Sequence, residues 1–446
     1  MPAFRPASIA ATLALFAATP AQLPAETVKD REGAVRNDKA SMEKDARWIY
    51  NDLAKGFATA KSSGKPLLVV LRCVPCLACM GIDASILESS DLAPLLDRFV
   101  CVRLINANSL DLTNFQFDYD LSFSTLFFHA DGTVIGRYGS WQHQKDSSNT
   151  SLSGYTASAQ AALAIHSRWP DIKPLLAPKQ GRPTPFRTPI DIPELAGRYS
   201  RDLDWNGKVV QSCVHCHQIG DALRAWHRSE GRPIPDALIY PMPSPETIGL
   251  SLDPASATSV LSVTKGSPAA SAGLQPGDRI LSAASAPLVS AADFAWALHL
   301  LPSSATTLPL QIQRASANTA ITLTLPASWR SQSDISNRAG TWGLRAMALG
   351  GLQLVRLSDD ARRAASIPPD SLALEINHAG EYGKHAAAKN AGFRKGDILT
   401  AFDGQSSDLS ESALIGLILQ SRKPGTTIPV TVRRDGKSLD LSLPVQ

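Results

Sequence analysis

The first sign of structure is the spacing of the apolar residues that follow residue 42. They recur every three or four positions up to a Gly-Lys-Pro stretch, as in an amphipathic helix, and then form a continuous apolar run, as in a buried strand. A turn signal, Asp-Gly, separates two later strand-like runs and predicts a hairpin. The predicted segments are 42–66 (helix), 67–71 (strand), 81–99 (helix), 100–107, 124–130 and 133–139 (strands), and 153–169 (helix). This order predicts an α/β domain over residues 42–168.

An internal repeat dominates the C-terminal half. The stretch "GSPAASAGLQPGDRIL" at 266–281 matches "GKHAAAKNAGFRKGDIL" at 383–399. Two similar stretches so far apart indicate two copies of one domain, because solenoid repeats have much shorter periods. We expect the copies, which read as mainly β, at 244–327 and 348–446. The predicted fold class is therefore a multidomain chain, α/β followed by mainly β.

Three segments lie outside these domains. Residues 26–41 are polar and charged, and we predict a flexible leader there. Residues 169–198 are rich in proline, which fixes φ and removes an N–H donor, so an extended, semi-rigid linker is expected. Residues 199–243 form a short segment that contains the sequence CVHCH.

The N-terminus has the order of a secretory signal. Arg5 precedes an apolar run from Ile9 to Ala18, and small residues and prolines follow, which predicts a signal peptide over 1–25 and a periplasmic or secreted protein. The run is shorter than the ~20 residues of a membrane span, and no later segment reaches that length, so no transmembrane span is expected. The net charge of +4 contains no basic block, which argues against nucleic-acid binding.

The α/β segment, with cysteines at the end of its first central strand, resembles the thioredoxin fold. It is most similar to secreted thioredoxin-like domains, in which a tryptophan, two alanines and Gly-Lys-Pro precede an apolar strand and a CxxC motif. The corresponding residues are Trp48, Ala54, Ala60 and 64–66. A single cysteine in a later strand, Cys101, is expected to be a buried core thiol.

Three cysteines, Cys73, Cys76 and Cys79, follow the apolar strand at three-residue spacing. In the thioredoxin arrangement the nucleophilic cysteine lies at a helix N-terminus, where free N–H groups and the helix dipole lower its pKa. Because proline belongs near a helix start, Pro75 favours Cys76 as the nucleophile and Cys79 as the resolving thiol. Cys73 would be a third thiol able to pair with Cys76. A Cys73–Cys76 active pair, a static disulfide and a three-thiolate metal site remain open alternatives.

The stretch from Cys213 to His217 matches the CxxCH pattern of c-type haem attachment. At such sites two thiols, here Cys213 and Cys216, bond to the haem, and the next histidine, here His217, is an axial ligand of the iron. Met242 is the first choice for the sixth ligand, and His227 is the second. A local disulfide or a zinc site made of the cysteines and a histidine are the alternatives.

The repeats resemble bacterial PDZ domains, which hold a peptide C-terminus on the backbone N–H groups of a loop and add the peptide to a strand edge. The resemblance implies a loop and groove for C-terminal peptides or exported proteins in each copy. The alternative is a groove that its own chain fills. The implied peptide-binding residues are Ile248, Gly249 and Leu250 in the first copy and Gly350, Gly351 and Leu352 in the second.

Taken together, the stretches "CVPCLAC", "CVHCHQIGDA" and "HAAAKNAGFRKGDI" resemble the thioredoxin/PDZ (seleno)protein family of environmental bacteria. The resemblance implies a reactive group in the first thiol motif. We therefore expect an exported thiol–disulfide oxidoreductase that docks partners through PDZ domains, exchanges with a redox partner protein and carries a c-type haem. The alternative is a non-enzymatic PDZ scaffold with structural disulfides or a metal.

Overall fold

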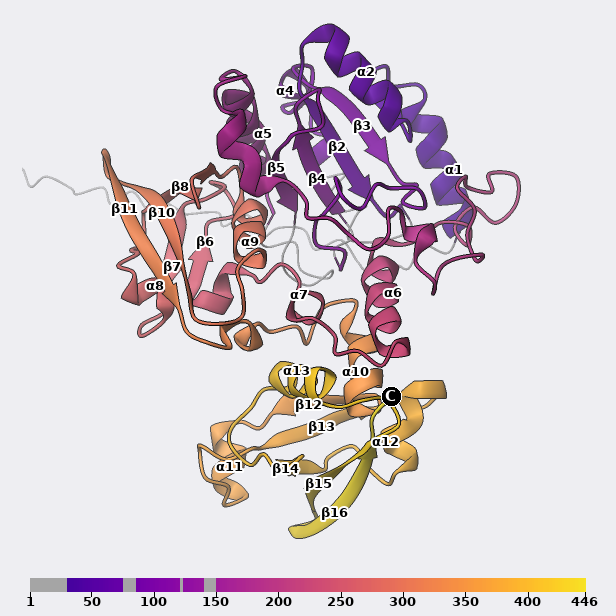
Figure 1. Cartoon of the computed structure of the whole chain (residues 1–446), viewed down its shortest axis with the longest axis vertical. Helices are drawn as coiled ribbons and strands as arrows, with labels where there is room; N and C mark the ends of the chain where they lie inside the picture. Colours follow the sequence, from indigo (N-terminus) through magenta and orange to yellow (C-terminus); the bar gives the residue numbers. More distant parts are fainter. Residues whose placement is uncertain (1–29, 75–85, 121–122, 140–149) are drawn as a thin grey trace, which may run out of the picture.

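The computed structural model describes residues 30–74, 86–120, 123–139 and 150–446 (Figure 1). Its N-terminal domain is built on a five-stranded sheet of order β1-β3-β2-β4-β5. The pairs β1–β3 and β2–β3 are parallel, and β2–β4 and β4–β5 are antiparallel. The strands are β1 (Trp48–Tyr50), β2 (Leu67–Arg72), β3 (Val100–Leu104), β4 (Phe123–Phe128) and β5 (Val134–Gly139).

Strand β2 explains why the apolar run of the sequence is continuous rather than alternating. Leu67, Val69 and Leu71 pack in the same core as Ala60 of helix α2 (Leu53–Ser63). Leu68 and Val70 belong to a second core on the opposite face, which contains side chains of helix α5 (Leu152–His166). A strand buried on both faces needs apolar residues at every position. The short helix α4 (Ala93–Leu96) contributes to the second core.

Two predictions for the ends of this domain are wrong. Residues 31–41, predicted as a flexible leader, lie in helix α1 (Arg31–Met42), whose Val35 is buried. The start of the predicted helix at 42–66 contains strand β1, which pairs with β3. Tertiary pairing overrides local helical spacing here, because β1 gains a hydrogen-bonded neighbour at the sheet edge.

The proline-rich residues 169–198 also differ from the expected extended spacer. They contain the 3₁₀ helices η2 (Lys173–Lys179) and η3 (Pro189–Asp191), followed by helices α6 (Cys216–Ser229) and α7 (Asp236–Ile239) in residues 199–243. Apolar side chains between the prolines are buried and pin the segment to the protein: Ile172, Leu176, Ile192 and Leu195.

The first repeat contains a two-stranded sheet, β6–β7, and a four-stranded sheet of order β11-β10-β8-β9. Residues 315–316 form the tight turn between β10 and β11, the two longest strands of this repeat. The elements are η4 (Pro245–Ile248), β6 (Leu250–Leu252), β7 (Val260–Val263), α8 (Pro268–Ser271), β8 (Arg279–Ala283), β9 (Ala286–Pro287), α9 (Ala291–His299), β10 (Thr306–Arg314), β11 (Ala317–Leu325) and η5 (Trp329–Gln332).

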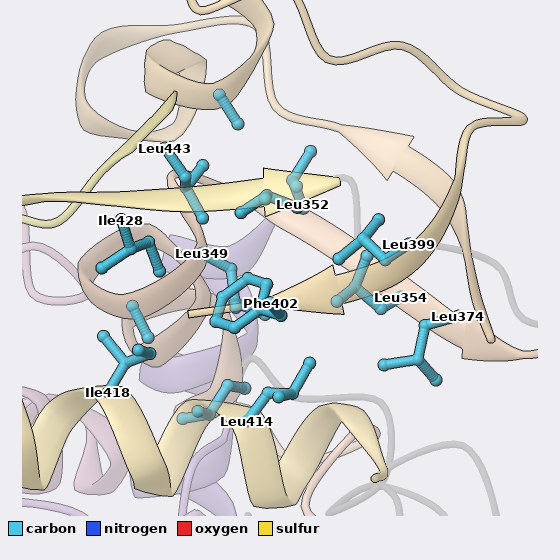
Figure 2. Close-up of a cluster of buried hydrophobic side chains, with 14 of the residues drawn as sticks. Leu349, Leu352, Leu354, Leu374, Leu399, Phe402, Leu414, Ile418, Ile428 and Leu443 are labelled. Carbon is cyan, nitrogen blue, oxygen red and sulfur yellow. The ribbon is translucent and has the colours of Figure 1, made fainter. Parts of the chain in front are cut away.

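The second repeat forms a five-stranded antiparallel sheet of order β12-β13-β14-β15-β16. Figure 2 shows Leu414 and Ile418 of α13 beneath this sheet, on the side of Phe402. The elements are α10 (Thr341–Leu349), β12 (Leu352–Arg356), α11 (Asp359–Ala364), β13 (Leu374–Ala379), η6 (Gly383–Ala386), α12 (Ala387–Asn390), β14 (Ile398–Phe402), α13 (Glu411–Ser421), β15 (Thr427–Arg434) and β16 (Lys437–Pro444).

The two copies of the repeat contain the same pair of hydrogen bonds between an aspartate and an arginine. In the first copy Asp278 accepts hydrogen bonds from the Arg314 guanidinium at 2.8 Å through both carboxylate oxygens. In the second copy Asp397 accepts the same pair of bonds from Arg434 at 2.7 Å. Within the described residues, no helix is long and apolar enough to cross a membrane.

Candidate functional site

The first thiol motif lies at the carboxyl end of strand β2. Cys76 and Cys79, the predicted nucleophile and resolving thiol, lie outside the described residues. Cys73 is described and directly follows Arg72, the last residue of β2. It is partly buried and packs against the core that holds helix α5.

A histidine from the second thiol motif meets this cysteine. His215 Nδ1 lies 3.1 Å from Cys73 Sγ, although the two residues are 142 positions apart in the sequence. His215 is the N-cap of helix α6, and its backbone N–H donates to Gln218 Oε1 at 2.8 Å. The helix start therefore fixes the position of an imidazole that can exchange a proton with the Cys73 thiol.

The two thiol motifs share one small cavity. Its volume is about 30 Å³, enough for a single water molecule. Its wall is mostly aliphatic and includes three of the cysteines. The lining residues are Val35, Arg72, Cys73, Val74, Ile105, Leu203, Val209, Val210, Cys213, Val214, His215 and Cys216. The site thus joins α1, the ends of β2 and β3, and the segment that leads into α6.

Burial sets the protonation of the groups from the second motif. Desolvation raises the pKa of Cys213 to about 11 and that of Cys216 to about 12, and the neighbouring Cys213 charge adds to the rise at Cys216. Desolvation also lowers the pKa of His215, with a smaller contribution from His217. At neutral pH this arrangement holds two protonated thiols beside a neutral imidazole.

Cys101 lies apart from this site. It is 1% exposed in the core of the sheet domain, and its thiol donates to the Leu96 carbonyl at 3.5 Å. Burial raises its pKa to about 12. The prediction of a buried core thiol is confirmed.

The predicted haem ligands are not brought together. The His217 side chain is 43% exposed and contacts Asp221 at 3.3 Å, on the next turn of α6. Met242 is buried in a separate cluster with Ala295 and Trp296 of the first repeat. His227, the second choice, contacts the Trp226 ring near the end of α6.

Cys213 and Cys216 both line the cavity beside Cys73. Because His217 and Met242 lie in different surroundings, this arrangement does not pair them as axial ligands, and haem c stays a prediction for an absorption spectrum to test. Among the described residues, no group of three or more His, Cys, Asp or Glu side chains is placed to hold a metal ion.

Comparisons with known proteins agree with both domain types. Residues 48–130 match the thioredoxin-like family, and residues 247–325 and 383–445 each match the PDZ domain family. The chain contains a thioredoxin-like domain and two PDZ domains. The thiol site therefore lies at the end of the central strand of the thioredoxin-like domain.

The individual relatives cover only parts of the chain. The serine protease Do-like HtrA of Lactobacillus helveticus is 36% identical over 63 residues, which are 14% of this chain and 15% of that protein. Two structures of the HtrA-type protease AlgW, with a decapeptide and with a tripeptide, are 17% and 15% identical. They cover 31% and 33% of this chain and 41% and 55% of their own, each with a TM-score of 0.20. This chain thus spans little more than half of these relatives at most.

In the first PDZ domain, the predicted peptide-binding loop is largely engaged in the fold. Ile248 and Leu250 are buried core residues. Gly249 has a φ of 75°, which ends helix η4, and its N–H donates to the Glu246 carbonyl at 2.9 Å. An added Cβ at Gly249 would lie 2.2 Å from Ser267 Cβ, so this position requires glycine.

In the second PDZ domain, helix α10 supplies the acceptor for the loop. The N–H groups of Gly350 and Gly351 both donate to the Arg345 carbonyl of α10. Leu352 is completely buried. These N–H groups are the ones that would hold a peptide carboxylate, so the helix before the loop already satisfies them.

The Arg345 side chain continues this contact across to helix α13. Its guanidinium forms a buried bidentate ion pair with Glu411, with N–O distances of 2.9 and 2.6 Å. The backbone N–H of Leu354 in β12 also donates to this carboxylate, with 2.7 Å between the nitrogen and Glu411 Oε1. Strand β12 is the edge strand where a peptide would add, and Glu411 accepts from one of its backbone N–H groups.

Sequence reasoning did not single out His215, Arg345 or Glu411. The signal for His215 was its place between the two cysteines of the CxxCH motif, but the haem interpretation directed attention to His217. The signal for Arg345 was its place in an apolar helix directly before the glycine loop.

Proposed function

We propose that the protein is an exported thiol–disulfide oxidoreductase whose PDZ domains dock partner proteins. The observation that carries this proposal is the 3.1 Å contact between Cys73 Sγ and His215 Nδ1 at the end of β2 in the thioredoxin-like domain. A neutral imidazole beside a thiol assists formation of the thiolate, which is the form that attacks a disulfide. The signal-like residues 1–25 support export to an oxidising compartment.

The roles in the first motif follow from the sequence. Cys76 attacks the substrate disulfide and Cys79 resolves the mixed disulfide. Cys73, whose thiol meets His215, is a third thiol that can attack a disulfide or exchange with Cys76. The substrates would be disulfides of exported proteins, and a redox partner protein would restore the starting state. The PDZ domains would select such partners by their C-terminal peptides.

The test is disulfide reduction by the full chain and its single serine variants. Replacing Cys76 by serine should abolish turnover of a protein disulfide such as that of insulin, and Cys79→Ser should leave a trapped mixed disulfide. The Cys101→Ser variant is the matched control, because Cys101 is buried away from the site. Full activity in Cys76→Ser would exclude this assignment.

A second candidate is a non-enzymatic PDZ scaffold. The raised pKa values of Cys213 and Cys216 favour it, because thiols that stay protonated at neutral pH are less reactive. Equilibration in graded glutathione separates the two functions. A structural bridge stays oxidised at potentials below about −300 mV, whereas a working pair titrates at higher potentials.

A further inference from the structure

The two thiol motifs meet at the ends of neighbouring strands. Strands β2 and β3 are parallel partners, with Leu71 opposite Leu104. Cys73 follows the end of β2, and the Cys213 thiol donates to the Ile105 carbonyl, just after β3, at 3.3 Å. Neighbouring strands are ~4.8 Å apart, so the register places Cys73 and Cys213 at the same edge of the sheet.

The contents of the shared cavity point to exchange between these sulfurs. Cys73, Cys213, Cys216 and His215 all line it, and its other walls are mostly aliphatic. The cavity of about 30 Å³ lies between Cys73 and the second motif, so a sulfur of one motif faces the other across it. Cys73 is therefore a reaction partner within reach of Cys213.

The spacing of the second motif also suits a reversible disulfide. Cys213 and Cys216 are separated by two residues and line the same cavity. Cys213 and Cys216 are both thiols here, the form that a donor needs.

We propose that Cys213 and Cys216 are a second redox dithiol, which passes two electrons across the cavity to a disulfide at Cys73. The proposal deepens the proposed function, because the disulfide at Cys73 arises when Cys73 attacks a substrate disulfide, R′S–SR, which forms Cys73–S–S–R and releases R′SH. It assigns the CxxCH segment a thiol role in place of haem attachment.

The exchange balances in two steps. Cys213 Sγ attacks Cys73 Sγ in the disulfide Cys73–S–S–R, so the Cys73–Cys213 bond forms and RS⁻ leaves. The proton lost by Cys213 ends on RS⁻, and His215 Nδ1 is placed to carry it. Cys216 then attacks Cys213, which forms the Cys213–Cys216 disulfide and releases the Cys73 thiol. Two thiols are oxidised, and one disulfide is reduced to RSH and Cys73–SH.

The decisive experiment traps the intermediate in the full-length protein. Cys216→Ser removes the resolving thiol, so treatment with oxidised glutathione, followed by acid quench and peptide mass mapping, should reveal a Cys73–Cys213 disulfide in most molecules. Cys213→Ser should lack this link, and Cys101→Ser should leave it unchanged in a background that contains Cys216→Ser. Glutathione adducts on Cys73 of Cys216→Ser without any link to Cys213 would overturn the proposal.

A second measurement needs no change in the Cys213–Cys216 pair. In the wild-type protein, oxidised glutathione should convert the pair to its disulfide at least about tenfold faster than in Cys73→Ser, since Cys73 is the entry point. Equal rates would contradict the proposal. Both readouts are covalent links rather than turnover, so they stay informative even if the protein reduces no substrate protein, which would contradict the proposed function alone.

Discussion

At the scale of residues, the described cysteines differ because their surroundings differ. Cys101 is enclosed in the sheet core and reaches only a backbone carbonyl. Cys73 lies at a strand end and meets an imidazole. Cys213 and Cys216 share its cavity, and desolvation raises the pKa of both thiols. Reactivity toward small electrophiles should therefore fall from Cys73 to Cys213 and Cys216, with Cys101 last.

His215 should control the reactivity of Cys73. In His215→Ala, alkylation of Cys73 by iodoacetamide at pH 7 should slow by at least about tenfold, because the group that accepts the thiol proton is removed. Since burial lowers the pKa of His215, the wild-type rate assistance should persist below the ordinary histidine range and be lost only when the imidazole is protonated. Peptide mass spectrometry over time at several pH values measures both effects.

His217→Ala is the control for this prediction. His217 follows the motif but contacts Asp221 and is 43% exposed, so its removal should change the Cys73 rate less than twofold. Equal slowing in both variants would indicate a general disturbance of α6 rather than a specific role of His215.

The contact between Cys73 and His215 shows where prediction from sequence ends. Clusters of cysteines can be recognised by their spacing, and both were found this way. Their meeting depends on how the segment before α6 packs across β3, and no periodicity in the sequence links positions 142 residues apart. The same CxxCH spacing suits haem and dithiol chemistry, and only the places of His217 and Met242 in the fold argue for one over the other.

At the scale of elements, helix α10 contacts both the glycine loop and the helix α13 of the second PDZ domain. Its Leu344, Ala348 and Leu349 belong to the same core as α13. Its last carbonyls satisfy the glycine loop, and Arg345 pairs with Glu411. A peptide can reach the glycine loop only by displacing these contacts, so affinity for free peptides should be low in the intact chain.

Arg345→Ala should weaken the packing of α10 against α13. Removal of one partner from a buried ion pair leaves Glu411 uncompensated, which costs about 3–5 kcal/mol. We expect lower stability of the second PDZ domain in denaturant unfolding and an increased affinity for hydrophobic C-terminal peptides in fluorescence polarisation. Arg363→Ala, which removes an exposed pair with Asp360, should change neither. Loss of stability without any gain in peptide affinity would refute a gating role of α10.

The bond between Asp278 and Arg314 should make the first PDZ domain sensitive to acid. Hydrogen bonding from Arg314 lowers the pKa of Asp278 below its usual value. A carboxyl group with a lowered pKa in the folded state contributes stability above its unfolded pKa of about 3.9, and this contribution is lost as the pH falls. Asp278→Asn should thus be less stable than wild type at pH 6, with the difference shrinking toward pH 3 in thermal unfolding. Asp360→Asn, at an exposed pair, is the control and should show no such trend.

Elements with strong local signals were predicted well, and those fixed by packing were not. Local sequence alone predicts three features: the continuous apolar run in β2, the hairpin at Asp131–Gly132 and the repeated glycine turns. Helix α1 and the 3₁₀ helices of the proline-rich segment are short and polar or proline-broken. They hold because a few apolar side chains dock on the rest of the protein, which local propensity does not report.

At the scale of the whole molecule, buried charges tie the domains together. Asp120 of the thioredoxin-like domain accepts bonds from Arg224 of α6 and Arg338 between the PDZ domains. Arg338 also pairs with Asp118. Figure 1 shows α6 between the thioredoxin-like domain and the second PDZ domain. Since the thiol site needs β2 and α6 in a fixed relation, this junction helps to hold Cys73 against His215.

The interface with the first PDZ domain has its own buried ion pair. Asp293 of α9 accepts hydrogen bonds from Lys179 Nζ at 2.6 Å and from the backbone N–H groups of Arg137 and Val289. Trp296, on the same helix, packs under the Arg137 guanidinium and donates to the Pro178 carbonyl. The proline-rich segment therefore packs between the two domains and does not hold them apart as a spacer.

Asp293→Ala should release this interface. It leaves Lys179 buried without its partner, and burial already lowers the pKa of that amine, so we expect a loss of about 3–5 kcal/mol in denaturant unfolding. Limited proteolysis should then cut within residues 169–198 faster than in the wild type, in which apolar side chains of this segment are buried. The double variant Lys179→Met with Asp293→Asn removes both charges and should regain most of the lost stability, because replacing a whole buried pair is often neutral. If Asp293→Ala unfolds and is cleaved like wild type, the ion pair does not hold the domains together, and the fixed docking inferred here would have to rest on the apolar contacts of Trp296 alone.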